Sequence, residues 1–268
     1  MSDDSSRHFV QSLRKGLEVI ASFTEDHPRQ TLSDVARRAG MTRASARRFL
    51  LTLVDLGYVD HDGTIFSLRP TVLQIGRSYL SMLTLPDIAE PHMRSLSEAV
   101  GEAVSLCLLD AEDAVIVAQQ RPGRTLSHQT FVGSRLPALA SSPGRILLAG
   151  LSDQELDEFV GVAKIRRLTP YTLTDRARLG EVIRRVRRAG YAVTDEEYRI
   201  GIRAIAMPIY QRPDSPAASL AVSVRSRRVS ARMLVNDMLP KLQLTIHAIE
   251  GDLARRANRR QNPDPAGT

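Results

Sequence analysis

The feature of this sequence that most constrains its fold is residues 31–68, where two short helices, a glycine turn and a hairpin are expected in succession. Thr31 is placed to cap the first helix, because Asp34 three residues later completes a capping box. Gly40 follows that helix, where reversal of the chain favours a positive φ. Thr42 caps the second helix, and an Asp-Gly pair supplies the hairpin turn. This order predicts a winged helix-turn-helix.

The second of these helices is expected to have one buried face and one exposed face. Its apolar residues recur at helical spacing and should pack inward. They are Ala46, Phe49, Leu50 and Leu53. The outward-facing hydroxyls and arginines suit phosphates and base edges, since arginine can bind guanine as a fork. We therefore predict a DNA-contacting surface made of Ser33, Thr42, Arg43, Ala44, Ser45, Arg47 and Arg48.

Local charge supports a nucleic-acid partner. Residues 29–48 contain six arginines and a single acidic residue, Asp34. Over residues 1–70, ten basic residues stand against nine acidic ones, so the positive charge is confined to a patch. A short amphipathic helix pair is common core packing, and the DNA-binding interpretation therefore depends on the wing and on this patch.

Composition narrows the class of protein. A chain of 268 residues suggests two domains, and 43% hydrophobic and 25% charged residues are ordinary for a globular protein. The net charge of +7 suits nucleic acid, although a basic protein at a membrane surface would look similar. The start of the chain lacks the apolar segment of a signal peptide, and no stretch approaches the roughly 20 apolar residues of a membrane span. We expect a cytoplasmic protein without membrane association.

The sequence contains no recognisable catalytic or metal-binding arrangement. HExxH, GxSxG, a glycine-rich phosphate loop and paired cysteine motifs are all missing. The single cysteine, Cys107, excludes an internal disulfide and lies in an alternating run, where we expect a small buried side chain. We therefore predict no enzyme activity, no metal and no cofactor.

The apolar periodicity of the sequence, together with its helix-breaking residues, divides the chain into four parts. Before the winged unit, an apolar helical stripe is expected to complete a three-helix core with Val10, Leu13, Leu17, Ile20 and Phe23. After it, a wide apolar arc predicts a linker helix, ended by Pro86, that pairs with its copy in a second subunit or packs within the chain. The predicted parts are a DNA-binding domain at 9–70, the linker helix at 71–85, an effector-binding domain at 86–257 and a disordered tail at 258–268.

Beyond the linker, strands and helices alternate. Helices are expected at 88–100, at 174–189 with a solvent-facing arginine run, and at 230–257 with an interruption at Pro240. Strands are expected at 103–109, 114–120, 125–131, 202–210 and 217–225. An antiparallel sheet flanked by helices follows, and the fold class is α+β.

Two loops of this second domain have an unusual content of small, polar and basic residues. They cover residues 133–145 and 194–209. Ser141 and Ser142 precede an apolar helix, a position that can attract an anion. The alternative is a structured connection with no ligand.

Three stretches in this order resemble the IclR family of bacterial transcriptional regulators. They are LSDVARRAGMTRASARRFLLTLVDLGYV, GSRLPALASSPGRILLA, and GYAVTDEEYRIGIRAIAMPI followed by SLAVSV. The resemblance implies a winged helix-turn-helix joined to an effector-binding domain of GAF-like architecture. RASARRFLLTLVDLGYV, LQIGRSYLS and LPDIAEP are most similar to the branch that regulates the β-ketoadipate pathway and responds to protocatechuate or para-hydroxybenzoate.

The resemblance also implies an effector pocket. The family's small-acid binders often have an aspartate, a cysteine and a serine where this chain has Thr194, Ala204 and Ala221, so fewer polar groups here suit an aromatic ring. Arg135 or Arg203 could hold the carboxylate as a fork, although Arg203 could instead pair with Glu196 or Glu197. The predicted effector-binding residues are Arg135, Ser141, Ser142, Thr194, Arg203, Ala204, Ala221 and Ser223.

The sequence thus predicts a ligand-responsive transcriptional regulator, a homodimer or homotetramer that binds double-stranded DNA at a pseudo-palindromic operator. The expected effector is an aromatic carboxylate that biases how the DNA-binding domains of the two subunits are arranged. Two alternatives are a constitutive DNA-binding protein whose second domain serves oligomerisation only, and an enzyme with a DNA-binding appendage.

Overall fold

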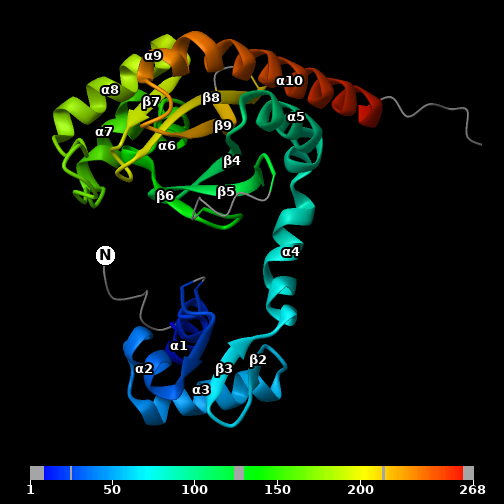
Figure 1. The fold of residues 1–268 in the computed structure, drawn as a ribbon, viewed down its shortest axis with the longest axis vertical. Coiled ribbons are helices and arrows are strands. Elements are labelled where there is room, and N and C mark those ends of the chain that lie inside the picture. The colour runs from blue at the N-terminus through cyan, green and yellow to red at the C-terminus, as the bar shows by residue number, and fades with distance from the viewer. Residues whose placement is uncertain (1–8, 25, 124–129, 213–214, 262–268) are drawn as a thin grey trace, which may run out of the picture. The chain divides into compact units, whose positions relative to one another are not determined.

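The computed structural model describes residues 9–261, except for residue 25, residues 124–129 and residues 213–214. The chain forms two compact units, Met1–Met82 and Leu83–Thr268 (Figure 1). None of the helices in the described part of the chain combines the length and the apolar character that a bilayer crossing requires.

The N-terminal unit packs three helices on a small antiparallel sheet. The helices are α1 (Gln11–Ala21), α2 (Leu32–Arg38) and α3 (Arg43–Asp55), and the strands β1 (Arg29–Thr31), β2 (Val59–His61) and β3 (Ile65–Leu68) follow the order β1-β3-β2. The Thr31 hydroxyl accepts from the Asp34 amide while the Asp34 carboxylate accepts from the Thr31 amide, which completes the predicted capping box. Val35, Leu50 and Phe66 are buried at the centre of this unit.

The predicted core stripe of α1 is only partly correct. Phe23 is buried and Ile20 is half-buried, but Val10, Leu13 and Leu17 are each more than half exposed. Only the C-terminal half of α1 packs on the rest of the unit, so its N-terminal half leaves an apolar face uncovered. Helical spacing reports that a face is apolar, and it does not report what covers that face.

The linker also differs from its prediction. A 3-10 turn, η1 (Pro70–Val72), leads into α4 (Leu73–Met82), and the next helix, α5 (Thr84–Val100), follows after one residue. The break therefore lies at Leu83, and Pro86 lies in the first turn of α5, where a missing N–H costs no helical hydrogen bond. No residue of α4 is buried, although its apolar arc is intact.

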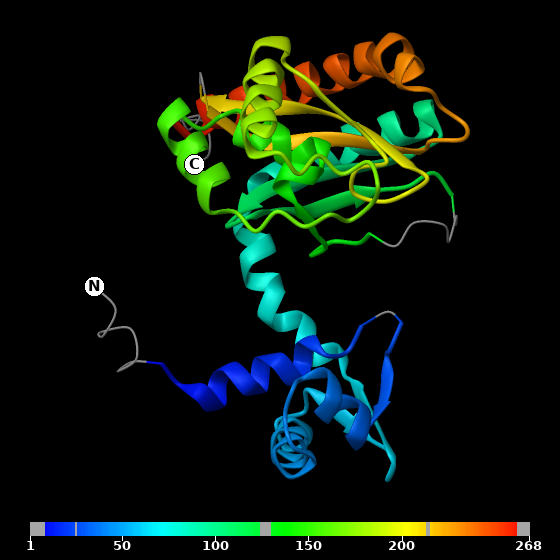
Figure 2. The same cartoon turned by 90° about the vertical axis from the view of Figure 1, so that its left-hand side faces the viewer.

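The C-terminal unit, at the top of Figure 2, contains a six-stranded antiparallel sheet. The strand order is β6-β5-β4-β9-β8-β7. Its strands are β4 (Ala103–Asp110), β5 (Asp113–Gln120), β6 (Arg135–Pro137), β7 (Ala192–Asp195), β8 (Ile202–Arg212) and β9 (Ser215–Arg225). The predicted α+β class is confirmed. Of the predicted strand at 125–131, residues 125–129 lie outside the described residues, and the edge strand β6 begins four residues later.

Helices cover both faces of this sheet. The remaining elements are η2 (Ala138–Ala140), α6 (Ser142–Leu148), α7 (Asp153–Val162), α8 (Arg176–Ala189), α9 (Ala231–Met233), the π-helical turn η3 (Leu234–Met238) and α10 (Leu239–Gln261). Leu220 and Val222 of β9 belong to the core shared with α5 and α10, whereas Ala221 between them belongs to the core shared with α6, α7 and α8. Large side chains fill the first face and small ones line part of the second.

The last helix is interrupted earlier than predicted. The π-helical turn η3 precedes Pro240, which is the second residue of α10. Because proline has no N–H and crowds the preceding turn, the widened turn relieves the clash. The backbone of α10 continues to Gln261, so residues 258–261 of the predicted tail are helical, and residues 262–268 lie outside the described part of the chain.

Candidate DNA-contacting surface and ligand cavity

The exposed face of α3 carries most of the predicted DNA-contacting residues. Ala46, Leu50 and Leu53 are buried, as the periodicity indicates. The Thr42 hydroxyl caps the helix by accepting from the Ser45 amide at 3.2 Å. Ser45 is half-buried, and the other members of the predicted surface are exposed: Ser33 on α2, then Thr42, Arg43, Ala44, Arg47 and Arg48.

Some arginines of this unit form ion pairs and others do not. Arg29 pairs with Asp62 at 2.7 Å and Arg37 with Asp34 at 2.8 Å. Within the described residues, Arg43, Arg47 and Arg48 have no acidic partner. Arg38 of α2 and Arg69 also have no ion pair among the described residues, but three of the unpaired arginines share the exposed face of α3, which concentrates positive charge there.

A cavity lies in the C-terminal unit between the sheet and the N-terminal end of α6. Its volume, counted as the room available to the centre of a water molecule, is about 60 Å³. A single water needs roughly 10–15 Å³ by this measure, so the cavity admits a small molecule several times that size. Six of the predicted effector-binding residues line it: Ser141, Ser142, Thr194, Ala204, Ala221 and Ser223.

Small side chains from the strands create this space. Ala103 of β4, Ala204 of β8 and Ala221 of β9 line the cavity beneath α6. Ile116 and Leu136 add larger apolar surface. The cavity is therefore apolar over much of its wall, with hydroxyl groups set into it.

Ser142 carries an unsatisfied polar atom at the cavity wall. The side chain is fully buried, and its Oγ has no hydrogen-bond partner within the described part of the chain. The neighbouring Ser141 hydroxyl is occupied, because it donates to the Pro137 carbonyl and accepts from the Gly144 amide. A buried hydroxyl without a partner costs free energy, so a ligand or water is expected to bind Ser142.

Neither Arg135 nor Arg203 lines the cavity, which corrects their predicted role. Arg135 lies on the edge strand β6 and contacts Asp110 and Asp113 at 2.7 and 2.8 Å, and these carboxylates raise its pKa. Arg203 pairs with Asp195, opposite it in the β7–β8 register, at 2.7 Å. The ion-pair alternative for Arg203 was thus right in kind, but its partner is neither Glu196 nor Glu197.

Sequence reasoning missed several residues of the cavity wall. Tyr198 and Arg199 lie within the segment 194–209 that drew attention for its composition, but only the structure directs them to the cavity. Among the described lining residues Arg199 is the only charged one. Ser105 and Cys107 alternate with Ala103 on one face of β4, a period of two that the sequence does contain.

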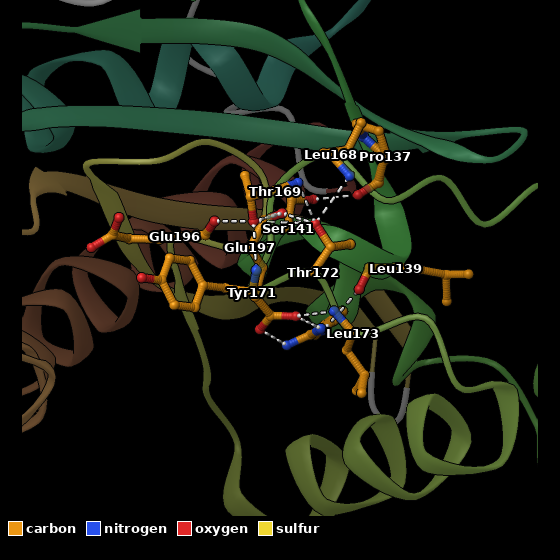
Figure 3. Close-up of polar contacts among 11 residues, drawn as sticks. Pro137, Leu139, Ser141, Leu168, Thr169, Tyr171, Thr172, Leu173, Glu196 and Glu197 are labelled. Carbon is orange, nitrogen blue, oxygen red and sulfur yellow. Dashed lines mark hydrogen bonds and ion pairs between the residues drawn. The ribbon is translucent and has the colours of Figure 1, made fainter.

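A buried ion pair joins the two loops that border the cavity. Arg145 of α6 contacts Glu197 with both terminal nitrogens, at 2.8 and 2.6 Å, and its Nε donates to the Leu139 carbonyl. Its partners Glu197 and Leu139 are labelled in Figure 3. The guanidinium is 3% exposed and the carboxylate 14%. This bidentate contact ties the Ser141–Ser142 end of α6 to the segment that carries Tyr198 and Arg199.

A threonine turn holds the same segment from its other side. The Thr169 hydroxyl donates to the Glu196 carbonyl, and the Thr172 hydroxyl donates to the Glu197 carbonyl, both at 2.7 Å (Figure 3). Glu196 itself has a positive φ of 57°, a conformation that non-glycine residues rarely adopt. The segment that positions Tyr198 and Arg199 is therefore held by contacts from outside it.

Cys107 should be unreactive in the folded protein. Burial raises the pKa of its thiol to about 12, and the side chain is fully buried. At pH 8 only about one thiol in ten thousand is ionised, against roughly one in ten for an exposed cysteine of pKa 9. We expect slow labelling by a disulfide reagent at pH 8 that accelerates as the pH rises toward 12, and fast labelling in guanidinium. Rapid labelling of the native chain at pH 8 would contradict this burial.

Both parts of the chain match models of known protein families. The model of the IclR helix-turn-helix domain matches residues 12–63, and that of the bacterial transcriptional regulator IclR C-terminal domain matches residues 77–250. A similar curated protein is the Pca regulon regulatory protein of Pseudomonas putida, 38% identical over 87% of this chain and 81% of its own.

Two solved structures extend the comparison. A transcriptional regulator from Rhodococcus sp. RHA1 is 46% identical, with a TM-score of 0.80 over 92% of this chain and 99% of its own. An IclR homolog from Microbacterium hydrocarbonoxydans, crystallised with 4-hydroxybenzoate, is 25% identical, with a TM-score of 0.76 over 91% of this chain and 100% of its own.

Proposed function

Since the chain belongs to the IclR family of bacterial transcriptional regulators, we propose that it binds operator DNA through α3 and that an aromatic carboxylate in the C-terminal cavity controls this binding. Regulation of transcription, and not catalysis, is its activity. The observation that carries the proposal is the cavity itself, which combines apolar walls with the unsatisfied Ser142 hydroxyl and the positive charge of Arg199.

The DNA-contacting surface that we propose comprises Ser33 on α2 and the exposed side of α3 from Thr42 to Arg48. A helix with unpaired arginines and small neighbours fits a major groove, where arginine distinguishes guanine and hydroxyls reach phosphates. The hairpin of β2 and β3 then lies at the position of a wing. The proposed divisions of the chain remain 9–70 for this domain, 71–85 for the linker and 86–257 for the effector-binding domain.

The effector class follows from the chemistry of the cavity wall. Apolar surface from Ile116 and Leu136 suits a ring, while Ser142, Thr194 and Arg199 suit an anionic group. Two relatives support an aromatic carboxylate as the effector: one is named for the Pca regulon, and one was crystallised with 4-hydroxybenzoate. We assign the regulated genes to catabolism of aromatic acids by the β-ketoadipate pathway, in the cytoplasm, where the DNA is.

Two uncovered apolar surfaces support a dimer. At the start of α1 the exposed residues are Leu13, Leu17 and the N-cap residue Val10. On α4 they are Leu73, Ile75, Tyr79 and Met82. Apolar stripes of this length are normally buried, and a second copy of the chain would cover them. A two-fold dimer, alone or within a tetramer, presents two DNA-binding domains to a pseudo-palindromic operator.

Removing the exposed arginines of α3 tests the DNA-contacting role. Arg47→Ala and Arg48→Ala should each weaken binding to the operator by about 1–3 kcal/mol, because each substitution removes a phosphate or base contact. The melting temperature should not change, since both side chains are exposed and neither has an ion-pair partner in the described chain.

The measurement is fluorescence anisotropy of the dimer on its own upstream DNA. Arg94→Ala is the matched control, because it removes an exposed arginine of the C-terminal unit that forms an ion pair with Glu90. If both α3 variants bind as tightly as the control, α3 is not the reading helix.

A further inference from the structure

The side chain of Gln119 lies beside the cavity and forms a bridge between two cavity hydroxyls. Gln119 of β5 is paired directly with Ser105 of β4 in the antiparallel register. Its Nε2 lies 2.9 Å from the Ser105 Oγ and 3.1 Å from the Thr130 Oγ1. Ser105 and Thr130 line the cavity, whereas Gln119 does not. The Gln119 amide therefore contacts two hydroxyl groups that would contact a ligand, but it would not contact the ligand itself.

The orientation of this amide is determined by Arg121. The Arg121 Nε lies 3.0 Å from the Gln119 Oε1, and its terminal nitrogen donates to the Thr130 carbonyl. A guanidinium has donors and no acceptor, so the atom that it contacts must be the amide oxygen. The NH2 group is consequently the one that faces Ser105 and Thr130.

This orientation of the amide determines the direction in which each hydroxyl group donates its hydrogen. Each hydroxyl oxygen accepts from the amide NH2, and two donors cannot face one another, so each hydroxyl hydrogen must point away from Gln119. In the described part of the chain neither hydrogen has a protein acceptor. Among the described residues, Ser105 and Thr130 thus keep hydrogens that they can donate to a molecule in the cavity.

We propose that Gln119 is a positioning residue that makes this cavity selective for a carboxylate, by holding Ser105 and Thr130 as hydrogen-bond donors toward the effector. A carboxylate oxygen only accepts, so it satisfies both donors. The NH2 group of the corresponding carboxamide would face them donor to donor. The proposal deepens the effector assignment above and rests on it.

Gln119→Glu reverses the polarity with little change in shape. A carboxylate at this position accepts from Ser105 and Thr130, which turns their hydrogens away from the cavity, and it can still pair with Arg121. Calorimetric titration of the full-length protein would use 4-hydroxybenzoate, protocatechuate and the neutral 4-hydroxybenzamide as probes. We expect the wild-type protein to prefer the acids over the amide. In Gln119→Glu the Kd for the acids should rise about tenfold or more, while that for the amide stays or falls.

The selectivity ratio separates positioning from a general loss of structure, because a distorted cavity weakens acid and amide together. Gln120→Glu is the matched control, since it adds the same charge one residue along β5, where the side chain points to the opposite face. Gln119→Met serves if the glutamate variant does not fold. It frees both hydroxyls and should reduce the acid preference without reversing it.

Two results would overturn the proposal in different ways. If the wild-type protein binds the acids preferentially and Gln119→Glu keeps the selectivity of Gln120→Glu, the role of Gln119 is wrong and the effector assignment stands. If the wild-type protein binds neither acid, the effector assignment fails and this inference fails with it.

Discussion

Replacing Arg145 by methionine is expected to destabilise the C-terminal unit by about 3–5 kcal/mol, the cost of leaving one partner of a buried ion pair alone. Arg145 is 3% exposed and contacts both oxygens of Glu197. Its removal also takes a donor from the Leu139 carbonyl. Because the pair holds the segment of Tyr198 and Arg199 beside α6, effector binding should fall in parallel. Guanidinium unfolding of the full-length protein measures the effect.

Two further variants serve as the control and the rescue for Arg145→Met. Arg94→Met breaks an exposed pair with Glu90, and such pairs contribute less than about 1 kcal/mol. Adding Glu197→Leu to Arg145→Met removes the stranded carboxylate, so much of the stability should return. An Arg145→Met protein as stable as Arg94→Met would show that the pair does not hold the unit together.

Gly144→Ala is expected to produce the second large effect, because α6 lies against the backbone of η2 at this residue. A Cβ at this position would lie 2.2 Å from the Ala138 Cα and 2.4 Å from its carbonyl oxygen. Backbone cannot swing aside as a side chain does, so α6 must shift from η2, and overpacking of this kind costs about 1–3 kcal/mol or more. The shift moves Ser142, so the cavity should lose affinity for its ligand.

Gly161→Ala is the matched control for this substitution. Gly161 lies near the end of α7, and an added Cβ would meet nothing within 4 Å. Alanine is the better helix former, so the variant should equal the wild-type protein or gain up to about 1 kcal/mol. Thermal unfolding followed by circular dichroism compares the two. Equal melting temperatures for Gly144→Ala and Gly161→Ala would refute the close packing of α6 on η2.

Local signals account for what could be predicted from the sequence. The capping box of Thr31 and Asp34, the Thr42 cap and the hairpin all depend on contacts within a few residues, and the structure contains each of them. The fold class followed from alternating patterns of the same short range. The cavity residue Ser142 was suggested by its place before an apolar helix as well as by the resemblance, whereas Thr194 as a ligand contact came from the resemblance alone.

Long-range pairing explains the failures. Arg135 or Arg203 was expected to hold the carboxylate, with an ion pair as the alternative for Arg203. Folding brings Asp110 and Asp113 to Arg135, and strand register places Asp195 opposite Arg203. The donors Ser105 and Thr130 escaped notice for the same reason, since their role depends on Gln119 across the sheet. On α1, exposed and buried apolar stripes have the same spacing, so residues such as Leu13 were assigned to a core that does not reach them.

The central claim is that one chain reads DNA and senses an aromatic acid, and one titration tests both parts. Fluorescence anisotropy of the purified protein on its own upstream DNA is measured at two salt concentrations, with and without 4-hydroxybenzoate and protocatechuate. We predict tight binding that weakens with salt, exceeds binding to random DNA and shifts in the presence of at least one acid. Equal affinity for random and upstream DNA, unchanged by either acid, would contradict the account.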